Sequence, residues 1–424
     1  MSIRFALACL LLVFATSLLP AQSAVNGAYV IRNVRVFNGD TVAEGQTVVI
    51  NEGQIAAVGT TVTVPAGAQE IAGEGRTLMP GLMDAHIHLP IFPTTGASEA
   101  LQQSLAFGVT TSILMGAAPN QFVARIKGLE ETDSPGISAI VNAGIYATAP
   151  GGHPTQGGLS IPTLTAPGEA DAFVAARLAE GSDFLKIIVD DLSWMGPKVP
   201  TLDNATVAAL VTAAHARGRI AVAHIGDERS ARAAVAAGVD GLAHLFVGST
   251  GSPDFGQFAA QHRVFVIPTL SVLYATCGRP DGPGFLTEAE TMKQVTPRFR
   301  SMLEIPSRPS DIRCEAAPQA VRQLVAAGVP LLAGTDAPAP GTTYGASLHK
   351  ELEHLVAAGM TPTAALVAAT SATAMAFRMT DRGRIRAGMR ADVVLVDGDP
   401  SQRIRDTRNI VAVWKRGVRV QRAF

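Results

Sequence analysis

The chain has 424 residues and a hydrophobic fraction of 47%, with 16% charged residues and a formal net charge of −1. A chain of this length and composition can bury a large core and is too apolar to be disordered. Its 34 basic residues do not exceed its 35 acidic residues, and only 5% of the chain is aromatic, which argues against a protein that binds nucleic acid.

The first 24 residues are predicted to be a secretory signal peptide. Arg4 supplies a positive charge, Phe5 to Pro20 form a mostly apolar run, and small residues then allow cleavage after Ser23 or Ala24. The alternative is a membrane anchor, but the run is short for a bilayer span and no later stretch reaches about 18 unbroken apolar residues. We therefore expect a periplasmic or secreted protein without membrane contact once residues 1–24 are removed.

The two segments that flank the middle of the chain are predicted to form strands. Residues 28–75 and 384–421 alternate apolar and polar side chains, as half-buried strands do. An Asn-Gly pair at 38–39 is a turn signal within the first segment. We expect residues 25–77 and 384–424 to form one small β-sandwich, a single domain built from both ends of the chain.

Residues 78–383 repeat one pattern, in which a short apolar run alternates with alanine-rich, helix-like segments. Runs of this length are typical of strands buried on both faces of a parallel sheet. Eight such runs predict an α/β fold, a (β/α)8 TIM barrel. The alternative, an open doubly wound sheet, is weaker because no glycine-rich phosphate fingerprint follows any run. The runs are 78–88, 110–116, 137–146, 184–189, 220–226, 241–247, 264–272 and 330–337, and the clearest helices are 170–180, 203–217, 228–237 and 316–327, each followed by glycine.

Two cysteines, Cys277 and Cys314, remain after the predicted signal peptide. They bracket a stretch that begins rich in glycine and proline, after the seventh predicted strand. In an oxidising compartment they can pair and staple the ends of this insertion. The sequence leaves a disulfide and two free thiols as equal alternatives.

Six ionisable residues fall on five of the predicted barrel strands. His86 and His88 are two apart on the first strand, so their side chains point the same way, and barrel enzymes keep their active sites at the carboxyl ends of the strands. Each residue alone fits a packed core, but together they predict a divalent-metal site, and a buried lysine must find a partner or lose its charge. The other four are Lys186, His224, His244 and Asp336.

Four further polar residues are weaker candidates. His153 lies in a glycine-rich loop after the third strand and Tyr274 follows the seventh, so either could contact substrate or the oxyanion. Tyr146, at the end of the third strand, is a second tyrosine candidate. A solvated loop histidine and core-packed tyrosines are the alternatives. Asp84 shares the parity of the histidine pair and is expected to support a ligand from deeper in the barrel.

Four stretches resemble the amidohydrolase superfamily, in particular its imidazolonepropionase-like branch, which includes metal-dependent Xaa-Pro dipeptidases. They are 78–88 (LMPGLMDAHIH), 241–245 (GLAHL), 333–338 (AGTDAP) and 385–397 (IRAGMRADVVLVD). The resemblance covers nearly the whole chain after residue 24. Its motifs are specific for the superfamily and poorly specific for the substrate.

The resemblance implies a two-metal site, with Zn²⁺ as the expected ion. Asp336 would act as general base and then general acid beside a hydroxide that bridges the ions. The implied ligands are His86, His88 and Asp336 at the buried ion, His224 and His244 at the outer ion, and Lys186, which reacts with CO2 to a carbamate that bridges both.

The expected activity is hydrolysis of an amide bond in a dipeptide or an N-acyl amino acid. A mononuclear deaminase or an imidazolone-ring hydrolase of the same superfamily is the alternative enzyme, but such members lack the bridging lysine. A non-catalytic binding protein is the alternative outside enzymes, and the intact ligand set argues against it. A monomer and a homo-oligomer both remain open.

Overall fold

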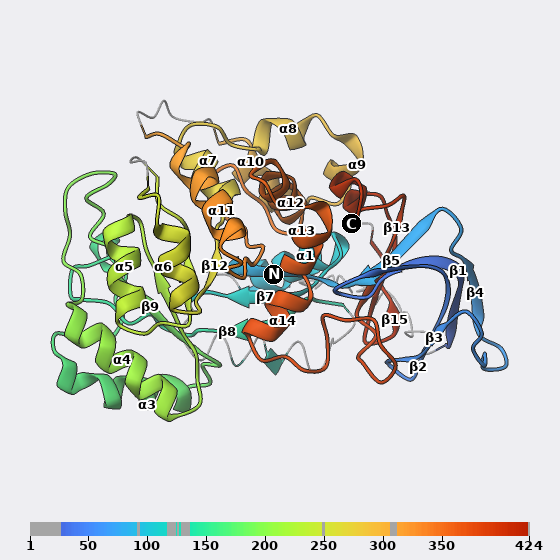
Figure 1. Ribbon diagram of the computed structural model, residues 1–424, viewed down its shortest axis with the longest axis horizontal. Helices are drawn as coiled ribbons and strands as arrows, with labels where there is room; N and C mark the ends of the chain where they lie inside the picture. The colour runs from blue at the N-terminus through green and yellow to red at the C-terminus, as the bar shows by residue number, and fades with distance from the viewer. Residues whose placement is uncertain are drawn as a thin grey trace, which may run out of the picture.

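The computed structural model describes residues 27–90, 94–116, 124, 127, 128, 136–247, 251–305 and 312–422. The predicted signal peptide, residues 1–24, lies outside these residues. In the view of Figure 1, helices α3 to α6 lie at one end of the molecule and strands β1 to β4 at the other, with helices α12 to α14 between them.

Both ends of the chain contribute to one mixed sheet. Its strand order is β15-β14-β13-β5-β1-β2-β3, and β4 pairs with β1. The two terminal segments thus lie side by side in this sheet, and their grouping as one separate domain stays a prediction. The strands are β1 (Tyr29–Phe37), β2 (Val42–Asn51), β3 (Gln54–Gly59), β4 (Gln69–Ala72), β5 (Arg76–Pro80), β13 (Val393–Asp397), β14 (Ile410–Lys415) and β15 (Val418–Arg419).

The terminal sheet curls on itself. Strands β1 and β14 are three steps apart in the sheet order, which is about 14 Å in a flat sheet. The rings of Tyr29 and Trp414 nevertheless lie 5.7 Å apart, centroid to centroid, and the amide of Ile55 donates to the carbonyl of Met389 at 2.8 Å. One apolar face thus packs against itself. The β-sandwich stays a prediction, because the pairing forms one continuous sheet.

The middle of the chain has a TIM-barrel-like α/β fold. Its strands form two parallel sheets, β6-β7-β8 and β9-β10-β11-β12. An isolated parallel bridge between Ala147 and Ile187 links the two sheets. The strands of this part are β6 (Leu82–Ile87), β7 (Val109–Leu114), β8 (Ala139–Asn142), β9 (Leu185–Ile188), β10 (Ala221–His224), β11 (Gly241–Ala243) and β12 (Phe265–Ile267).

The eighth predicted strand, 330–337, is not a regular strand. It contacts both neighbours through isolated parallel bridges, Leu331 with Val266 of β12 and Ala337 with Ile87 of β6. Asp336 has a left-handed φ of 58°, which interrupts the extended conformation that a ladder needs. A closed eight-stranded barrel therefore stays a prediction.

The first predicted strand, 78–88, is in fact two strands. Strand β5 pairs with β13 and β1 in the terminal sheet, whereas β6 pairs with β7. Gly81 stands between them, and a Cβ at this position would collide with the side chain of Thr110. The chain thus changes sheets a few residues beyond the predicted domain boundary at 77/78.

The helices agree well with the sequence pattern, because their ends are marked by capping residues. Asp203 and Asp227 accept hydrogen bonds from the amides of Thr206 and Ser230 at the first turns of α4 and α5. The four predicted helices are α3 (Ala170–Ala179), α4 (Asn204–Ala216), α5 (Glu228–Ala236) and α11 (Ala316–Ala326), and the glycines after them, Gly181, Gly218, Gly238 and Gly328, all have positive φ. The others are α1 (Thr94–Ala106), α6 (Phe255–Gln261), α7 (Leu270–Thr276), α8 (Gly282–Leu286), α9 (Ala289–Met292), α10 (Pro297–Leu303), α12 (Ala346–Ala357), α13 (Pro362–Ala368) and α14 (Ser371–Ala376).

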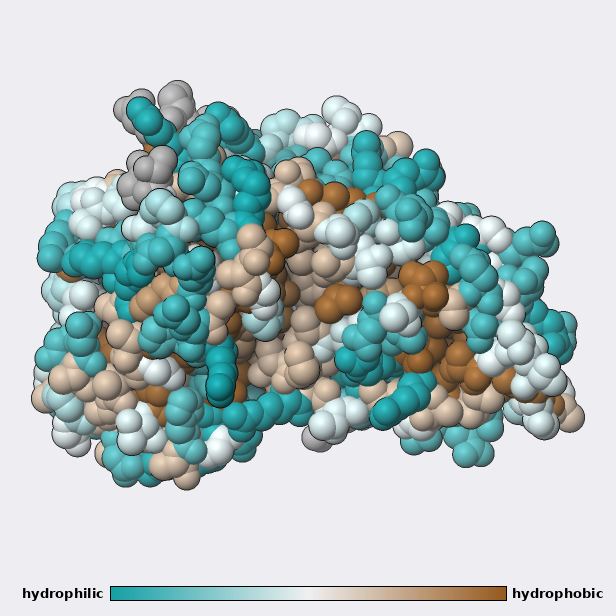
Figure 2. Space-filling view, in the orientation of Figure 1, coloured by the Kyte–Doolittle hydropathy of each residue, from teal (hydrophilic) through white to brown (hydrophobic). Residues whose placement is uncertain are grey.

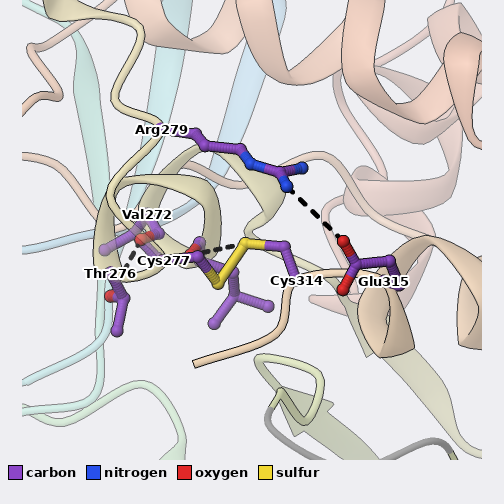
Figure 3. Close-up of a disulfide and its surroundings, with 7 residues drawn as sticks. Val272, Thr276, Cys277, Arg279, Cys314 and Glu315 are labelled. Atoms are coloured by element: carbon purple, nitrogen blue, oxygen red, sulfur yellow. Dashed lines mark hydrogen bonds and ion pairs between the residues drawn. A yellow bond between two sulfur atoms is a disulfide. The ribbon is translucent and has the colours of Figure 1, made fainter. Parts of the chain in front are cut away.

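Cys277 and Cys314 form a disulfide (Figure 3). Their Cα atoms are 5.9 Å apart although the residues are 37 positions apart in sequence. The bond ties the end of α7 to the segment before α11, and helices α8 to α10 lie within the closed loop. The hypothesis of a staple at the ends of the insertion is confirmed.

The visible surface is largely hydrophilic. Figure 2 shows teal and white over most of this face, with brown patches across the middle and near the terminal sheet. Large apolar side chains such as Met195 and Met375 are exposed singly. Within the part of the chain that the structure describes, no helix has both the length and the apolarity to cross a bilayer.

Candidate metal centre

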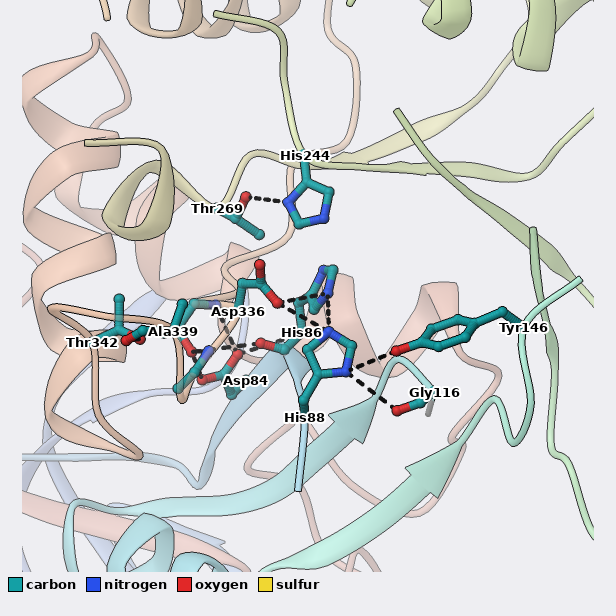
Figure 4. A network of polar contacts seen from close by, with 12 residues as sticks. Asp84, His86, His88, Gly116, Tyr146, His244, Thr269, Asp336, Ala339 and Thr342 are labelled. Atoms are coloured by element: carbon teal, nitrogen blue, oxygen red, sulfur yellow. Dashed lines mark hydrogen bonds and ion pairs between the residues drawn. The ribbon is translucent and has the colours of Figure 1, made fainter. Parts of the chain in front are cut away.

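Three of the predicted ligands point toward one another at the end of β6 (Figure 4). The Nε2 atoms of His86 and His88 lie 3.2 and 3.0 Å from Oδ1 of Asp336. The same two Nε2 atoms are 3.3 Å apart. Three potential donor atoms from two segments distant in sequence therefore face a common point.

Strands β10 and β11 bring two more histidines to the same place. The ring of His244 lies 4.6 Å from that of His86 and 4.7 Å from that of His224, centroid to centroid. One donor atom each from His86, His244 and Asp336 lies within 4.8 Å of the others. Such a group of imidazole nitrogens and a carboxylate can hold a divalent metal ion.

Lys186, on β9, completes the predicted set. Its side chain is almost fully buried, with 1% of its surface exposed, and its Nζ has no hydrogen-bond partner among the residues that the structure describes. Burial lowers the pKa of this amine to about 7, although the charge of Asp336 opposes the shift. A buried charged amine without a partner is costly, and an amine that loses its proton this readily fits a site built to receive cations.

The charge states of the cluster suit metal binding, because ligands must give up their protons. Burial, together with the nearby Lys186, lowers the pKa of His86 to about 3. Burial and the neighbouring His86 also hold the pKa of His244 well below its usual range. Although burial alone would favour the neutral acid, the contacts with His86 and His88 hold the pKa of Asp336 well below its ordinary value.

Asp84 ties β6 to the segment that carries Asp336. One of its oxygens accepts hydrogen bonds from the amides of His86 and Thr335, at 3.1 and 3.0 Å, and the other accepts from the Thr335 hydroxyl at 2.7 Å. The amide of Asp336 in turn donates to the carbonyl of His86 at 2.8 Å. Asp84 thus holds the backbone that carries His86 and Asp336 in place, the supporting role that its strand parity predicts.

His244 is oriented from the opposite side. Its Nδ1 lies 2.8 Å from the hydroxyl of Thr269, which leaves Nε2 facing the cluster. Directly after Thr269, the amides of Leu270 and Ser271 donate to the carboxylate of Glu351, a fully buried residue of α12. Burial raises the pKa of Glu351 to about 7.

The sequence analysis did not identify Glu351 as a support of the site, although its position in the helix pattern could have indicated it. Glu351 stands three residues after Leu348 and four before Leu355. This spacing places it on the apolar face of the last barrel helix. An acid on such a face needs partners, which here are backbone amides at the start of α7.

His153 lies near the cluster, and so does Asp190, which the sequence analysis missed. The ring of His153 is 5.1 Å from that of His224, and burial lowers its pKa to about 4, so it is neutral at pH 7. Asp190, directly beyond β9, places Oδ2 3.3 Å from Nε2 of His224. No metal-ligand spacing in the sequence marks Asp190, because its position depends on how the β9 loop folds.

The assignment of Tyr274 to the site is not supported. Residues 270–276 form helix α7 instead of continuing the predicted strand, so Tyr274 packs against His354 of α12, with ring centroids 4.7 Å apart. Tyr146 takes the place expected of a site tyrosine, since its hydroxyl lies 3.4 Å from Nδ1 of His88. The second tyrosine candidate is therefore the one that the fold brings to the cluster.

Comparison with known proteins agrees with this geometry. An uncharacterised protein of Mycobacterium tuberculosis is 26% identical over 311 residues, which cover 72% of this chain and 76% of that protein. An adenine deaminase of Ruegeria sp. is 26% identical over 374 residues, 86% of this chain and 53% of the deaminase. The crystal structure of a Xaa-Pro dipeptidase shares the fold, with a TM-score of 0.75, 23% identity and coverage of 93% of this chain and 99% of that one. The model of the amidohydrolase family matches residues 77–421, and the chain therefore belongs to the amidohydrolase family.

Proposed function

We propose that this amidohydrolase cleaves the amide bond of a dipeptide or an N-acyl amino acid, using two divalent metal ions. The observation that carries the proposal is the buried amine of Lys186, which has no hydrogen-bond partner within the described part of the chain and interacts electrostatically with His86 and His244 of the converging donor group His86, His244 and Asp336. A site for a single ion needs no lysine, whereas a lysine carbamate offers two anionic oxygens to a pair of ions.

Each donor has a proposed place in the pair of sites. His86, His88 and Asp336 would hold the inner ion, His224 and His244 the outer ion, and the carbamate of Lys186 would bridge them. Divalent ions held there, with Zn²⁺ expected, lower the pKa of a water molecule and polarise the substrate carbonyl. The neutral state that burial favours in Lys186 is the state that reacts with CO2.

The chain's own groups would move and hold the protons. Asp336 is ionised, so it can accept a proton from the attacking water and later deliver it to the leaving amine. His153 is neutral at pH 7 and lies beside His224, so its ring N–H can donate a hydrogen bond to the developing oxyanion. The hydroxyl of Tyr146 is a second donor at the rim.

The structural neighbours favour a small amide substrate. The Xaa-Pro dipeptidase structure holds methionine in its active site, and a related prolidase structure holds N-methylphosphonate-L-proline. The adenine deaminase relative favours the alternative, a deaminase or cyclic-amide hydrolase. The disulfide between Cys277 and Cys314 supports the proposed periplasmic or secreted location, because such bonds persist in oxidising compartments.

The test is a hydrolysis screen of zinc-loaded protein. The protein is incubated, with and without a chelator, with Xaa-Pro, Xaa-Arg and Xaa-hydrophobic dipeptides and with N-acyl amino acids. Adenine and cyclic imides are tested in parallel as substrates of the alternative function. We expect release of free amino acid that the chelator stops and added zinc restores. Turnover of adenine or a cyclic imide alone, with one ion bound per chain, would replace the proposal by the deaminase or cyclic-amide alternative.

A further inference from the structure

A buried carboxylate outside the predicted ligand set lies against His224. Asp190 is only 1% exposed. Its Oδ2 lies 3.3 Å from Nε2 of His224 and accepts the indole N–H of Trp194 at 3.1 Å. Its Oδ1 accepts the amide of Leu192 at 2.9 Å. Both oxygens therefore act as acceptors.

This contact determines which nitrogen of His224 carries the hydrogen. A carboxylate that accepts from an indole and a backbone amide presents a lone pair to the imidazole, so Nε2 of His224 is the donor in that contact. In a neutral imidazole the other nitrogen, Nδ1, then keeps its lone pair free for a metal ion.

The other three histidines of the cluster are arranged in the opposite sense. His86 and His88 direct Nε2 toward Asp336. His244 engages Thr269 through Nδ1, which also leaves Nε2 for the cluster. Among the four histidines, His224 is thus the one whose Nε2 is held by a group outside the predicted ligand set.

The loop is shaped to hold Asp190 in place. Gly226 lies two residues after His224, directly against the contact between Trp194 and Asp190. A Cβ at this position would collide with both the indole nitrogen of Trp194 and Oδ2 of Asp190. Leu192, whose amide donates to the carboxylate, adopts a left-handed φ of 58°, so the chain turns sharply directly after this bond. A bulkier residue at 226 would therefore separate Trp194 from Asp190.

We propose that Asp190 is a positioning residue, which holds His224 as the Nε2–H tautomer so that Nδ1 faces the outer metal ion. The inference rests on the two-ion function proposed above. It assigns Asp190 no contact with substrate. A carboxylate that orients a metal-bound imidazole typically changes metal affinity about 10–100-fold when it is removed.

The first test reads the tautomer directly, in metal-free, full-length mature protein with ¹⁵N-labelled histidine. Long-range ¹H–¹⁵N spectra distinguish Nδ1–H from Nε2–H. We expect His224 as the Nε2–H form in the wild type, and a shift toward a mixture of tautomers in Asp190→Asn. An Nδ1–H form in the wild type would overturn the proposal. Because this reading needs no metal and no variant, it stands apart from the two-ion function.

The second test measures zinc retained after dialysis against a graded series of chelators. We expect Asp190→Asn to keep the inner ion and to bind the outer one about 10–100-fold more weakly. Asp191→Asn is the matched control, since this adjacent carboxylate is equally buried but pairs with Ser193, Lys198 and Arg229 instead of His224. Trp194→Phe, which removes one donor to Asp190, should show a smaller loss in the same direction.

The outcomes separate the two proposals. Equal retention of both ions in Asp190→Asn and the wild type, with an unchanged tautomer, would reduce Asp190 to a loop cap and overturn this inference. A wild type that binds a single ion would overturn the two-ion function, and the tautomer spectra would still decide the role of Asp190.

Discussion

Asp336 is the residue on which the proposed chemistry depends. Its Oδ1 lies within 3.2 Å of two imidazole nitrogens, and its left-handed φ directs the backbone of the eighth segment out of the sheet. Replacement by asparagine keeps the shape but removes the base. We expect Asp336→Asn to lower kcat by about 10²–10⁴-fold, the typical share of a general base.

The measurement for Asp336→Asn is steady-state hydrolysis of the best dipeptide, with thermal unfolding as the check that the variant folds. His262→Ala is the control, because His262 is an exposed residue that bonds only within its own helix end among the contacts described. Activity of Asp336→Asn within a few-fold of the wild type would remove Asp336 from the role of base.

Lys186 gives a prediction for pH dependence. Its pKa is lowered to about 7, so the amine loses its proton as the pH rises through 7, and only the neutral amine reacts with CO2. At a fixed CO2 concentration, the CO2-dependent part of zinc uptake by metal-free protein should be about tenfold faster at pH 8 than at pH 6.

Lys186→Met is the control for this measurement and should show no CO2-dependent uptake. Zinc uptake that is independent of CO2 in the wild type would contradict the carbamate. Mass spectrometry under native conditions provides a second reading, since a carbamate adds the mass of CO2 to the chain.

At the residue scale, the sequence could predict the donors and one of their supports, Asp84, but not the other supports. Histidines at strand ends and a lysine inside an apolar run are unusual enough to be recognised without a structure. Asp190 and Glu351 are ordinary acids in sequence, and their roles arise only when the β9 loop and α12 fold back onto the site. Tyr274 was misplaced for the same reason, because α7 begins where the strand was expected to continue.

At the scale of elements, helix ends were predictable and strand ends were not. Asp203 and the glycine at 218 mark the bounds of α4 within the chain itself. The break of 78–88 falls at the pair Pro80-Gly81, a turn signal that the continuous apolar run around it concealed, and the close approach of Thr110 to Gly81 is visible only in the fold. Likewise, Asp336 leaves the extended conformation where its amide donates to the carbonyl of His86 in β6, a contact that only the fold reveals.

The α7–α12 contact gives a prediction at the scale of elements. The carboxylate of Glu351 receives two amides at the start of α7. In Glu351→Gln an NH2 group replaces one of the two acceptor oxygens, so one buried backbone amide has no acceptor. We expect this loss to destabilise the protein by about 1–3 kcal/mol. Urea unfolding of the metal-free protein measures this change in the free energy of unfolding.

The control for Glu351 is Glu304→Gln, which breaks a half-exposed ion pair with Arg300 and should change stability little. Because Thr269 precedes the two amides and bonds His244, Glu351→Gln should also weaken zinc binding. A variant as stable as the wild type and with unchanged zinc affinity would show that Glu351 does not hold this turn.

At the scale of the whole molecule, three features join distant parts of the chain: the curled terminal sheet, the two parallel sheets and the disulfide. The sequence predicted that both ends meet, because each carries the same alternating pattern. It could not predict that the ends pair as one continuous sheet or that β5 belongs to it, since register and partner choice are tertiary properties.

The disulfide gives a prediction at this scale. It closes a loop of 37 residues, and the loop-entropy relation gives a stabilisation of about 4 kcal/mol for such a loop. We expect Cys277→Ser combined with Cys314→Ser to lower the free energy of unfolding by about 2–4 kcal/mol, and reductant to lower that of the wild type equally. The double variant, as the control, should not respond to reductant, and free thiols in the unfolded, unreduced wild type would contradict the bond.

The most direct test of the central claim is the zinc content of the protein reconstituted with bicarbonate and freed of loose metal by gel filtration. The convergence of four histidines, Asp336 and Lys186 predicts two ions per chain in the wild type and fewer than two in Lys186→Met. One ion per chain in the wild type, with Lys186 unmodified by mass, would contradict the two-ion site and favour a mononuclear enzyme.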